Sequence, residues 1–198
     1  MYPESIKKLI DSFKYLPGIG EKSAERLAFS MLSFDKDTLT NFSDSIISLR
    51  DKVKKCEICH NLSESDICMI CSDERRKKNT VFVVERVKDV YLFERLGIYH
   101  GLYHILDGVI SPMDGIGPED ININSLLERI KNDNIEEVIL ALKPNLEGET
   151  TMQYIIKLLE NYDVHVSKLA TGVPMGTDIE YIDSLTLEMA LEERKIVN

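Results

Sequence analysis

Residues 56–71 read CEICHNLSESDICMIC, and this stretch separates two parts of a 198-residue chain that follow different patterns. It holds the chain's four cysteines as Cys56-x-x-Cys59 and Cys68-x-x-Cys71, with eight residues between the pairs. Two such pairs can hold four thiolates tetrahedrally around Zn²⁺. The ion then replaces the hydrophobic core that so short a segment lacks. We therefore predict a zinc finger over residues 55–78 with one structural Zn²⁺ per chain, because four protein ligands leave no open position for a substrate.

Other uses of these cysteines are a redox pair or four unrelated thiols. Disulfides are disfavoured because thiols stay reduced in the cytosol, where we expect the chain to reside. His60 adjoins Cys59 and offers a substitute ligand, although we expect it to be a bystander. The basic run at residues 75–78 has two interpretations, a DNA contact or a solvated charged face.

The residues before the cysteines predict three helices, because apolar side chains recur there at helical spacing. Residues 16–20, Leu-Pro-Gly-Ile-Gly, break the chain between the first two helices. We expect residues 1–54 to form a small helical module. The apolar positions are Ile6, Leu9, Ile10 and Phe13 in the first helix, Ala24, Leu27, Ala28 and Met31 in the second, and Leu39, Phe42, Ile46, Leu49 and Val53 in the third.

The break between the first two helices contains a Gly-x-Gly turn. Gly18 and Gly20 can adopt positive φ and let a phosphate approach the backbone amides. The following helix points the positive end of its dipole toward the same phosphate. Lys22 and Arg26 lie one turn apart on that helix and can contact successive phosphates without reading bases. These four residues are the candidate DNA-binding site.

Charge is distributed unevenly along the chain. Residues 1–78 carry 14 Lys and Arg against 13 Asp and Glu, whereas residues 79–198 carry 10 against 21. Lys and Arg side chains that neutralise DNA phosphates release the counterions bound to the DNA, and this release drives binding. The first part of the chain is therefore the better candidate for a DNA contact. Glu21 and Glu25 dilute the positive field beside the turn, which favours the alternative of an ordinary helical hairpin.

After residue 80 the pattern changes to short apolar runs that alternate with helical stretches. Apolar strands separated by helices predict a parallel sheet covered on both faces. Residues 172–183 are expected to form a loop and residues 184–195 a closing helix. His104 falls in a predicted strand, where a hydrogen-bonded core or interface histidine is the usual explanation. The predicted strands are residues 81–84, 102–106, 138–142 and 164–169, and the helices between them include residues 90–96, 126–130 and 154–159.

The sequence gives no indication of a membrane-spanning segment. No apolar run approaches the roughly 18 to 20 residues that a membrane helix needs, and the first residues lack the layout of a signal peptide. With 43% hydrophobic and 29% charged residues, the chain has enough apolar content to bury a core. We expect a cytoplasmic, globular protein.

The Gly-x-Gly hairpin followed by four cysteines resembles the RecR family of bacterial recombination mediators. Residues 16–28 look like a helix-hairpin-helix, a sequence-independent DNA-binding element, and residues 83–85 with 140–149 look like a Toprim domain. Loops at 111–119 and 172–183 extend the resemblance to essentially the whole chain. The implied fold class is α/β, with an N-terminal helix-hairpin-helix module (1–54), a four-cysteine zinc finger (55–78), a Toprim-like parallel sheet with helices on both faces (79–171), and a C-terminal loop and helix at an oligomer interface (172–198).

Two positions in the Toprim-like segment depart from a catalytic pattern. Catalytic Toprim domains hold Mg²⁺ with a glutamate after strand one and an Asp-x-Asp-x-Glu-Gly-Glu cluster after strand three. Here Lys143 and Asn145 stand at the two aspartate places. A lysine cannot ligate Mg²⁺ and its charge opposes metal entry. The resemblance therefore implies the fold without the cleavage chemistry and without catalytic residues; the alternative is a Mg-dependent Toprim nuclease or primase-like enzyme.

Acidic residues lie near these strand ends. By resemblance to the RecR family, they would form the face that binds the partner protein RecO. A weak Mg²⁺ site and solvated carboxylates are the alternatives. Arg86 departs from the family pattern, which more often has an acidic or neutral residue at that position. The candidate partner-binding residues are Glu85, Asp89, Glu147 and Glu149.

The resemblance implies a non-enzymatic mediator of recombinational DNA repair after DNA damage. With RecO, and with RecF in some contexts, it would load RecA onto single strands coated by single-strand binding protein. It would bind single- and double-stranded DNA without sequence preference. Dimers would pair into a tetrameric ring, in which several weak phosphate contacts act together. We expect it at the nucleoid, in the cytoplasm, with no membrane partner.

Overall fold

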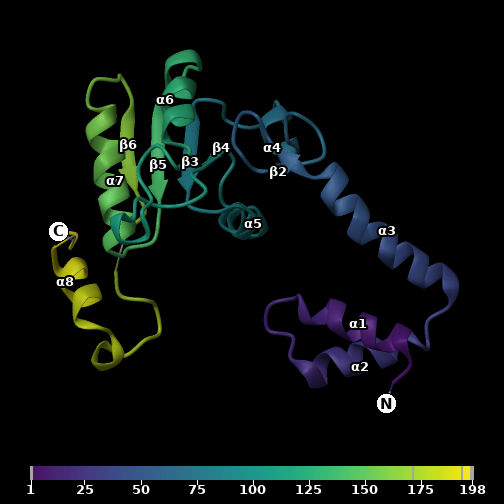
Figure 1. Ribbon diagram of the computed structural model, residues 1–198. Coiled ribbons are helices and arrows are strands. Elements are labelled where there is room, and N and C mark those ends of the chain that lie inside the picture. Colours follow the sequence, from purple (N-terminus) through teal and green to yellow (C-terminus); the bar gives the residue numbers. More distant parts are fainter. Residues whose placement is uncertain (1, 171, 193, 197–198) are drawn as a thin grey trace. The chain divides into compact units, whose positions relative to one another are not determined.

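The computed structural model describes residues 2–170, 172–192 and 194–196 (Figure 1). Thr171, the last residue of the predicted Toprim range, lies outside the described residues, as do residues 193 and 197–198 within the predicted C-terminal part. The chain divides into two compact units, Met1–Val53 and Lys54–Asn198. None of the described helices combines the length and the apolar character that crossing a membrane requires.

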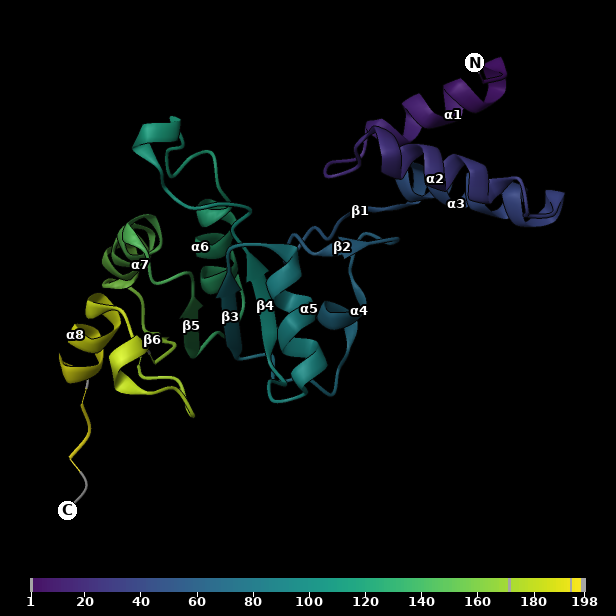
Figure 2. The same ribbon diagram turned by 90° about the horizontal axis from the view of Figure 1, so that it is seen from below.

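The first unit begins with two helices that pack on each other, α1 (Glu4–Lys14) and α2 (Glu21–Met31) (Figures 1 and 2). Their apolar stripes meet as the spacing predicts, and the small alanines of α2 let the helices approach closely. The buried residues of this hairpin core are Ile10, Phe13, Ala24 and Ala28.

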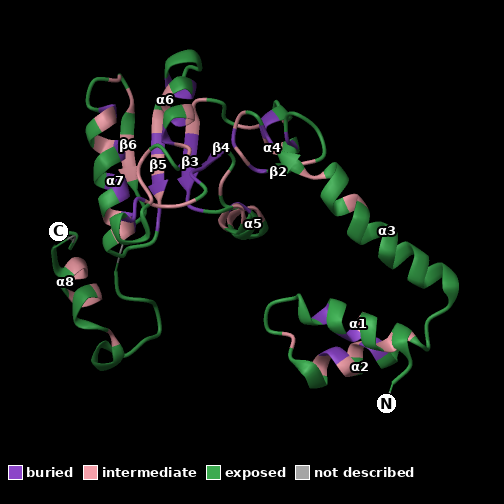
Figure 3. Cartoon of the chain, in the orientation of Figure 1, coloured by how far each residue is buried: buried purple, intermediate pink, exposed green. Residues whose placement is uncertain are grey.

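The third predicted helix is present as α3 (Lys36–Lys52), but it buries none of its residues (Figure 3). It begins at Asp35, whose carboxylate accepts a hydrogen bond from the Thr38 N–H at 2.7 Å. Its predicted apolar stripe is exposed, with 57% of Ile46 accessible to solvent. The predicted helix is therefore confirmed, but within the described chain its apolar stripe adds nothing to the buried core of the module.

The second unit opens with the cysteine-containing segment, which forms a short antiparallel pair, β1 (Lys54–Lys55) and β2 (Leu62–Ser63), and a one-turn helix, α4 (Met69–Ser72). This segment lies against β4 (Leu102–Ile105), an edge strand of the large sheet. The Ile105 N–H donates to the Cys59 carbonyl at 3.0 Å. The segment thus covers part of a sheet edge that would otherwise expose backbone groups.

The large sheet has the strand order β4-β3-β5-β6 with every neighbouring pair parallel. Its other strands are β3 (Thr80–Val84), β5 (Glu137–Ala141) and β6 (His165–Lys168). Because parallel strands need crossover connections, helices separate them along the chain. The predicted parallel sheet is confirmed.

Helices cover both faces of this sheet (Figures 1 and 2). Successive side chains of β3 point to opposite faces: Val81 and Val83 join the core under α6 (Ile123–Asn132) and α7 (Leu146–Leu159), whereas Phe82 and Val84 join the core under α5 (Val87–Leu96). Two buried layers explain why residues 81–84 of the central strand β3 are apolar throughout rather than alternating.

The C-terminal residues form the expected loop, with a short 3₁₀ turn η2 (Ile179–Tyr181), and then α8 (Ser184–Glu192). A similar 3₁₀ turn, η1 (Pro112–Asp114), lies in the loop after β4. The prediction that the closing helix reaches residue 195 is wrong, because residues 194–196 are not helical. No residue of α8 is buried.

Candidate functional site

The four cysteines gather at one place in the second unit. Their Sγ atoms all lie within 4.8 Å of one another and all four residues are buried. The Cys59 and Cys68 sulfurs are 3.5 Å apart, near the roughly 3.8 Å edge of a tetrahedron with Zn–S bonds of about 2.3 Å. The donor set, its spacing and its burial therefore fit a structural Zn²⁺ bound by all four thiolates.

The surroundings favour the thiolate form at Cys68, whereas hydrogen bonds to the neighbouring thiols and then burial raise the pKa of Cys59, and the pKa of Cys71 is raised as well. The Cys68 N–H donates to the Cys56 Sγ at 3.3 Å. Contact with the Cys59 and Cys71 thiols lowers the pKa of Cys68. At least one sulfur of the cluster is thus held as the thiolate that binds metal.

His60 is not part of the sulfur cluster. Its Nε2 lies 2.8 Å from the Ser125 Oγ, and its ring meets the buried His104 edge-on at 5.3 Å between centroids. The Nε2 of His104 in turn donates to the Asn122 carbonyl at 2.7 Å, as expected for a hydrogen-bonded core histidine. These histidines join the finger to α6 instead of ligating.

Within the basic run at residues 75–78, Arg76 joins the finger segment to α5 and to the residue before β4. Arg76 is only 15% exposed; it pairs with Glu94 and donates to the Gly101 carbonyl at 3.0 Å. Lys78 donates to the Cys71 carbonyl at 2.8 Å. For Arg76 the predicted solvated face is wrong, because its side chain is largely buried; Lys78 stays exposed, and a DNA contact by the run remains a prediction. No local pattern indicated their partners, which lie up to 25 residues away.

The hairpin turn uses only one of its two glycines in the left-handed region. Gly18 has φ +80°, but Gly20 has φ −86°, so the expectation of positive φ at both is wrong. Gly20 is the N-cap of α2 and offers no capping side chain. A Cβ at either glycine would meet nothing within 4 Å. The first amides of α2 therefore face open space that an oxyanion could enter.

Lys22 and Arg26 both project from α2 as exposed side chains, and neither forms an ion pair within the described part of the chain. Glu21, whose charge would otherwise dilute their field, is paired with Lys14 at 2.7 Å. This contact raises the pKa of Lys14, chiefly through its hydrogen bond to Glu21. Lys14 was not predicted as part of this surface, because no sequence pattern indicates an ion pair between residues on either side of the turn.

The acidic residue after β3 carries its own cations. Glu85 is buried at the carboxyl end of that strand. Its carboxylate lies 2.8 Å from the Arg86 Nε and 3.6 Å from the Lys143 Nζ. Arg86 differs from the usual residue of the RecR family at its position, and Lys143 replaces an aspartate of catalytic Toprim domains. Both side chains contact the same Glu85 carboxylate.

Another departure, Asn145, caps α7. Its side-chain oxygen accepts a hydrogen bond from the Gly148 N–H at 2.9 Å. A Cβ at Gly148 would lie 1.9 Å from the Lys143 carbonyl oxygen, so only glycine fits there. The helix therefore begins tightly at the Glu-Gly-Glu sequence. Of the two residues at the aspartate places, Asn145 caps α7 and Lys143 pairs with Glu85.

The remaining acids of this edge differ from one another. Asp89 accepts a hydrogen bond from the Arg86 N–H at 2.9 Å and so caps α5. Glu147 and Glu149 are half-buried in the first turns of α7, where the helix dipole favours negative charge. Among the residues that the structure describes, only the cysteines bring three or more potential metal ligands within 4.8 Å. The acids are therefore not arranged around a common ion.

Comparison with known proteins adds four family matches in chain order. They are a RecR helix-hairpin-helix (residues 6–49), a RecR four-cysteine zinc finger domain (53–73), a Toprim domain (79–170) and a RecR C-terminal region (172–195). Proteins named Recombination protein RecR from Staphylococcus aureus strains Newman and USA300 are each 49% identical over 193 residues, 98% of either chain. With the observed sheet and cysteine cluster, these matches confirm the predicted fold.

Proposed function

Since this chain belongs to the RecR family of recombination proteins, we propose that it is a non-enzymatic mediator of recombinational DNA repair. It binds single- and double-stranded DNA without reading bases, and it acts in the cytoplasm at the nucleoid. Together with RecO, and with RecF in some contexts, it loads RecA onto single strands. The domains act as separate modules: 1–54 on DNA, 55–78 as a zinc-stabilised element, 79–171 toward partners and 172–198 in assembly.

The open start of α2 carries this proposal. It combines the amides of the first turn, which no side chain caps, with open space beside Gly18 and Gly20. Lys22 and Arg26 follow on the same helix as exposed cations that no described residue pairs. A phosphate backbone satisfies such donors, and none of them distinguishes one base from another. With Glu21 paired to Lys14, Glu25 is the remaining acid beside Lys22 and Arg26, so the net charge that faces a phosphate is positive.

The test is the double variant Lys22→Ala/Arg26→Ala. We expect unchanged folding, weaker DNA retention and a shallower dependence of binding on salt, because each lost phosphate contact lowers the slope by about 0.9 on duplex DNA. The matched control is Lys7→Ala/Lys8→Ala, which removes the same charge from exposed positions on α1. Equal binding by the Lys22/Arg26 variant and the unchanged protein at matched salt would refute the contact.

The acidic edge supports the absence of nuclease chemistry. Two-metal cleavage needs carboxylates that share ions about 3.5–4 Å apart, whereas Glu85 is paired with Arg86 and Lys143. We expect no cleavage of nicked or supercoiled DNA with Mg²⁺ or Mn²⁺. Cleavage that needs a divalent ion and disappears in Glu147→Gln would establish the enzyme instead.

The same edge is proposed as the face that engages RecO through Glu85, Asp89, Glu147 and Glu149. Glu147 and Glu149 form no ion pair with any described residue, so they offer the stronger attraction for a basic partner, whereas the charge of Glu85 is already countered. A chain that assembles and binds RecO yet never associates with DNA would be a protein-binding scaffold only.

Exposed apolar side chains support assembly into dimers and a tetrameric ring. The stripe of α3 is left uncovered by the described chain, and the C-terminal part exposes further large apolar residues. Mass determination in solution, with and without DNA, tests this, and a monomer under all conditions would contradict it. The C-terminal apolar residues in question are Val173, Met175, Ile179, Tyr181 and Leu185.

One Zn²⁺ per chain is part of the proposal. The four buried thiols would hold it and leave no position for substrate. Metal analysis of the purified protein should return one equivalent, and a metal-free folded protein would contradict it.

A further inference from the structure

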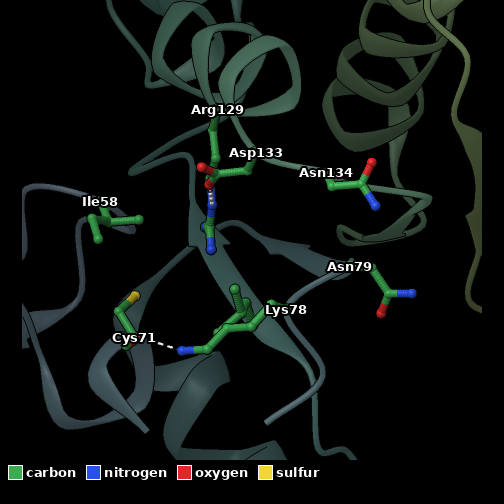
Figure 4. Close-up of a pocket in the computed structure, with 8 residues that line it drawn as sticks. Ile58, Cys71, Lys78, Asn79, Arg129, Asp133 and Asn134 are labelled. Atoms are coloured by element: carbon green, nitrogen blue, oxygen red, sulfur yellow. Dashed lines mark hydrogen bonds and ion pairs between the residues drawn. The ribbon is translucent and has the colours of Figure 1, made fainter. Parts of the chain in front are cut away.

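A cavity of about 370 Å³ lies in the second unit, between the zinc finger and the ends where β3 and β5 begin (Figure 4). The finger contributes Cys71 and, at the junction with β3, Lys78. The helix α6 contributes Arg129, and the residues after it contribute Asp133 and Asn134. The cavity is distinct from the hairpin turn and from the acidic edge, which lies at the opposite ends of the strands.

The most unusual group in this cavity is the guanidinium of Arg129. The residue is 6% exposed, and its Nη1 donates to the Tyr103 carbonyl at 2.7 Å. Its Nε is buried and makes no hydrogen bond to any described residue. Asp133 forms only an ion pair with that nitrogen, at 3.5 Å. A guanidinium has five N–H donors, and burying them unpaired is costly.

Lys78 adds a second cation to the cavity lining. Its ammonium donates to the Cys71 carbonyl and has three donors in all, so two remain. Asp133 is the single acid among the described residues that line the cavity. Its carboxylate side chain is half exposed and can turn toward solvent. The lining therefore offers more cationic donors than acceptors, which repels metal ions and favours an oxyanion.

We propose that this cavity binds a phosphomonoester group. Two cations from different elements match a dianion better than a single carboxylate charge. The Nε–Nη2 edge of Arg129 is suited to two phosphate oxygens once Asp133 turns away, while Nη1 stays on the Tyr103 carbonyl. The exposed Lys78 ammonium can donate to a third oxygen. Apolar lining from Ile58 and Leu102 leaves room for an organic group attached to the phosphate. The group belongs either to a free nucleoside monophosphate or to the 5′ end of a DNA strand.

The binding test uses the full-length zinc-loaded chain, titrated with inorganic phosphate, dAMP and acetate by calorimetry. We expect saturable binding of phosphate and dAMP and weaker binding of acetate. No saturable binding of either phosphate would overturn the proposal, as would acetate binding as tightly as phosphate.

Substitutions at two exposed positions that line the cavity should change the affinity for dAMP in opposite directions. Asp133→Asn removes the carboxylate that competes for Arg129 and should strengthen dAMP binding about threefold to fivefold. Asn134→Asp adds a competing carboxylate and should weaken it by a similar factor. The matched controls Asp163→Asn and Asn161→Asp make the same chemical changes at exposed positions outside the lining. Equal effects at the control positions would overturn the assignment.

The source of the phosphate is distinguished with oligonucleotides in the Lys22→Ala/Arg26→Ala background, which removes the proposed hairpin contact. Tighter binding of a 5′-phosphorylated strand than of its 5′-hydroxyl form, reversed by Asn134→Asp, identifies a strand end. Binding of dAMP without that preference identifies a free nucleotide. The absence of both kinds of binding would overturn the proposal.

Discussion

The cysteine cluster and the acidic edge both contain four potential metal ligands, yet their geometry differs. The four thiols lie within 4.8 Å of one another in a buried site. The acids of the edge are dispersed, and the buried one, Glu85, is already neutralised by Arg86 and Lys143. Residue types alone therefore do not define a metal site. The ligand atoms must lie close together, and their charge must not already be neutralised by Lys or Arg side chains.

The largest effect should follow from removing one sulfur. Cys68→Ser leaves three thiolates, so the chain should lose its zinc and at least about 3 kcal/mol of the free energy of unfolding, since metal binding replaces the missing core of the finger. Metal analysis and denaturant unfolding measure both. The control Ser72→Ala removes an exposed hydroxyl beside the same site and should change neither. Full zinc content in Cys68→Ser would contradict four-sulfur ligation.

The contact between the finger and the sheet should make stability depend on pH. Burial lowers the pKa of His104 to about 3, with Arg129 and His60 acting in the same direction and the Asn122 carbonyl opposing them. The unfolded chain, with a histidine pKa near 6.5, therefore binds a proton that the folded chain does not. Stability should fall as pH drops below about 6.5, by roughly 2 kcal/mol between pH 7 and pH 5.

Urea unfolding at both pH values, with zinc in excess, measures this dependence. The variant His104→Gln should lose about 2 kcal/mol less over the same interval, whatever its stability at pH 7. An equal pH dependence in both proteins would show that His104 is not held neutral by the fold.

On the acidic side, Lys143→Met should lower the free energy of unfolding by about 1 kcal/mol. The ammonium is exposed and its partner buried, which places the pair between surface and interior ion pairs. In a double-mutant cycle with Glu85→Gln, the two substitutions should couple. Lys157→Met, on the exposed side of α7, is the control and should not couple with Glu85.

The smallest effect is expected for Glu147→Gln. This carboxylate has no ion-pair partner among the described residues and gains only from the dipole of α7, so stability should change by less than about 0.5 kcal/mol. Thermal unfolding measures it. A loss above about 1 kcal/mol would mean that Glu147 has a structural contact like that of Glu85.

Much of the architecture was predictable because its signals are local. Helical spacing located α1 and α2, and apolar runs located the strands of the parallel sheet. The same spacing could not tell that α3 lacks a partner in the described chain, because an apolar stripe has the same pattern whether its own chain covers it or not. Nor did it place the end of α8 at Glu192, short of the predicted residue 195.

The sequence was enough to predict the four-cysteine cluster, the Gly-x-Gly hairpin and the order of strands and helices, since each depends on residues close together in the chain. Only the tertiary structure decided which charges are free. Arg76 pairs with Glu94, Lys14 with Glu21, and Lys143 with Glu85. Electrostatic pairing depends on distance in space, and folding sets that distance without regard to separation along the chain.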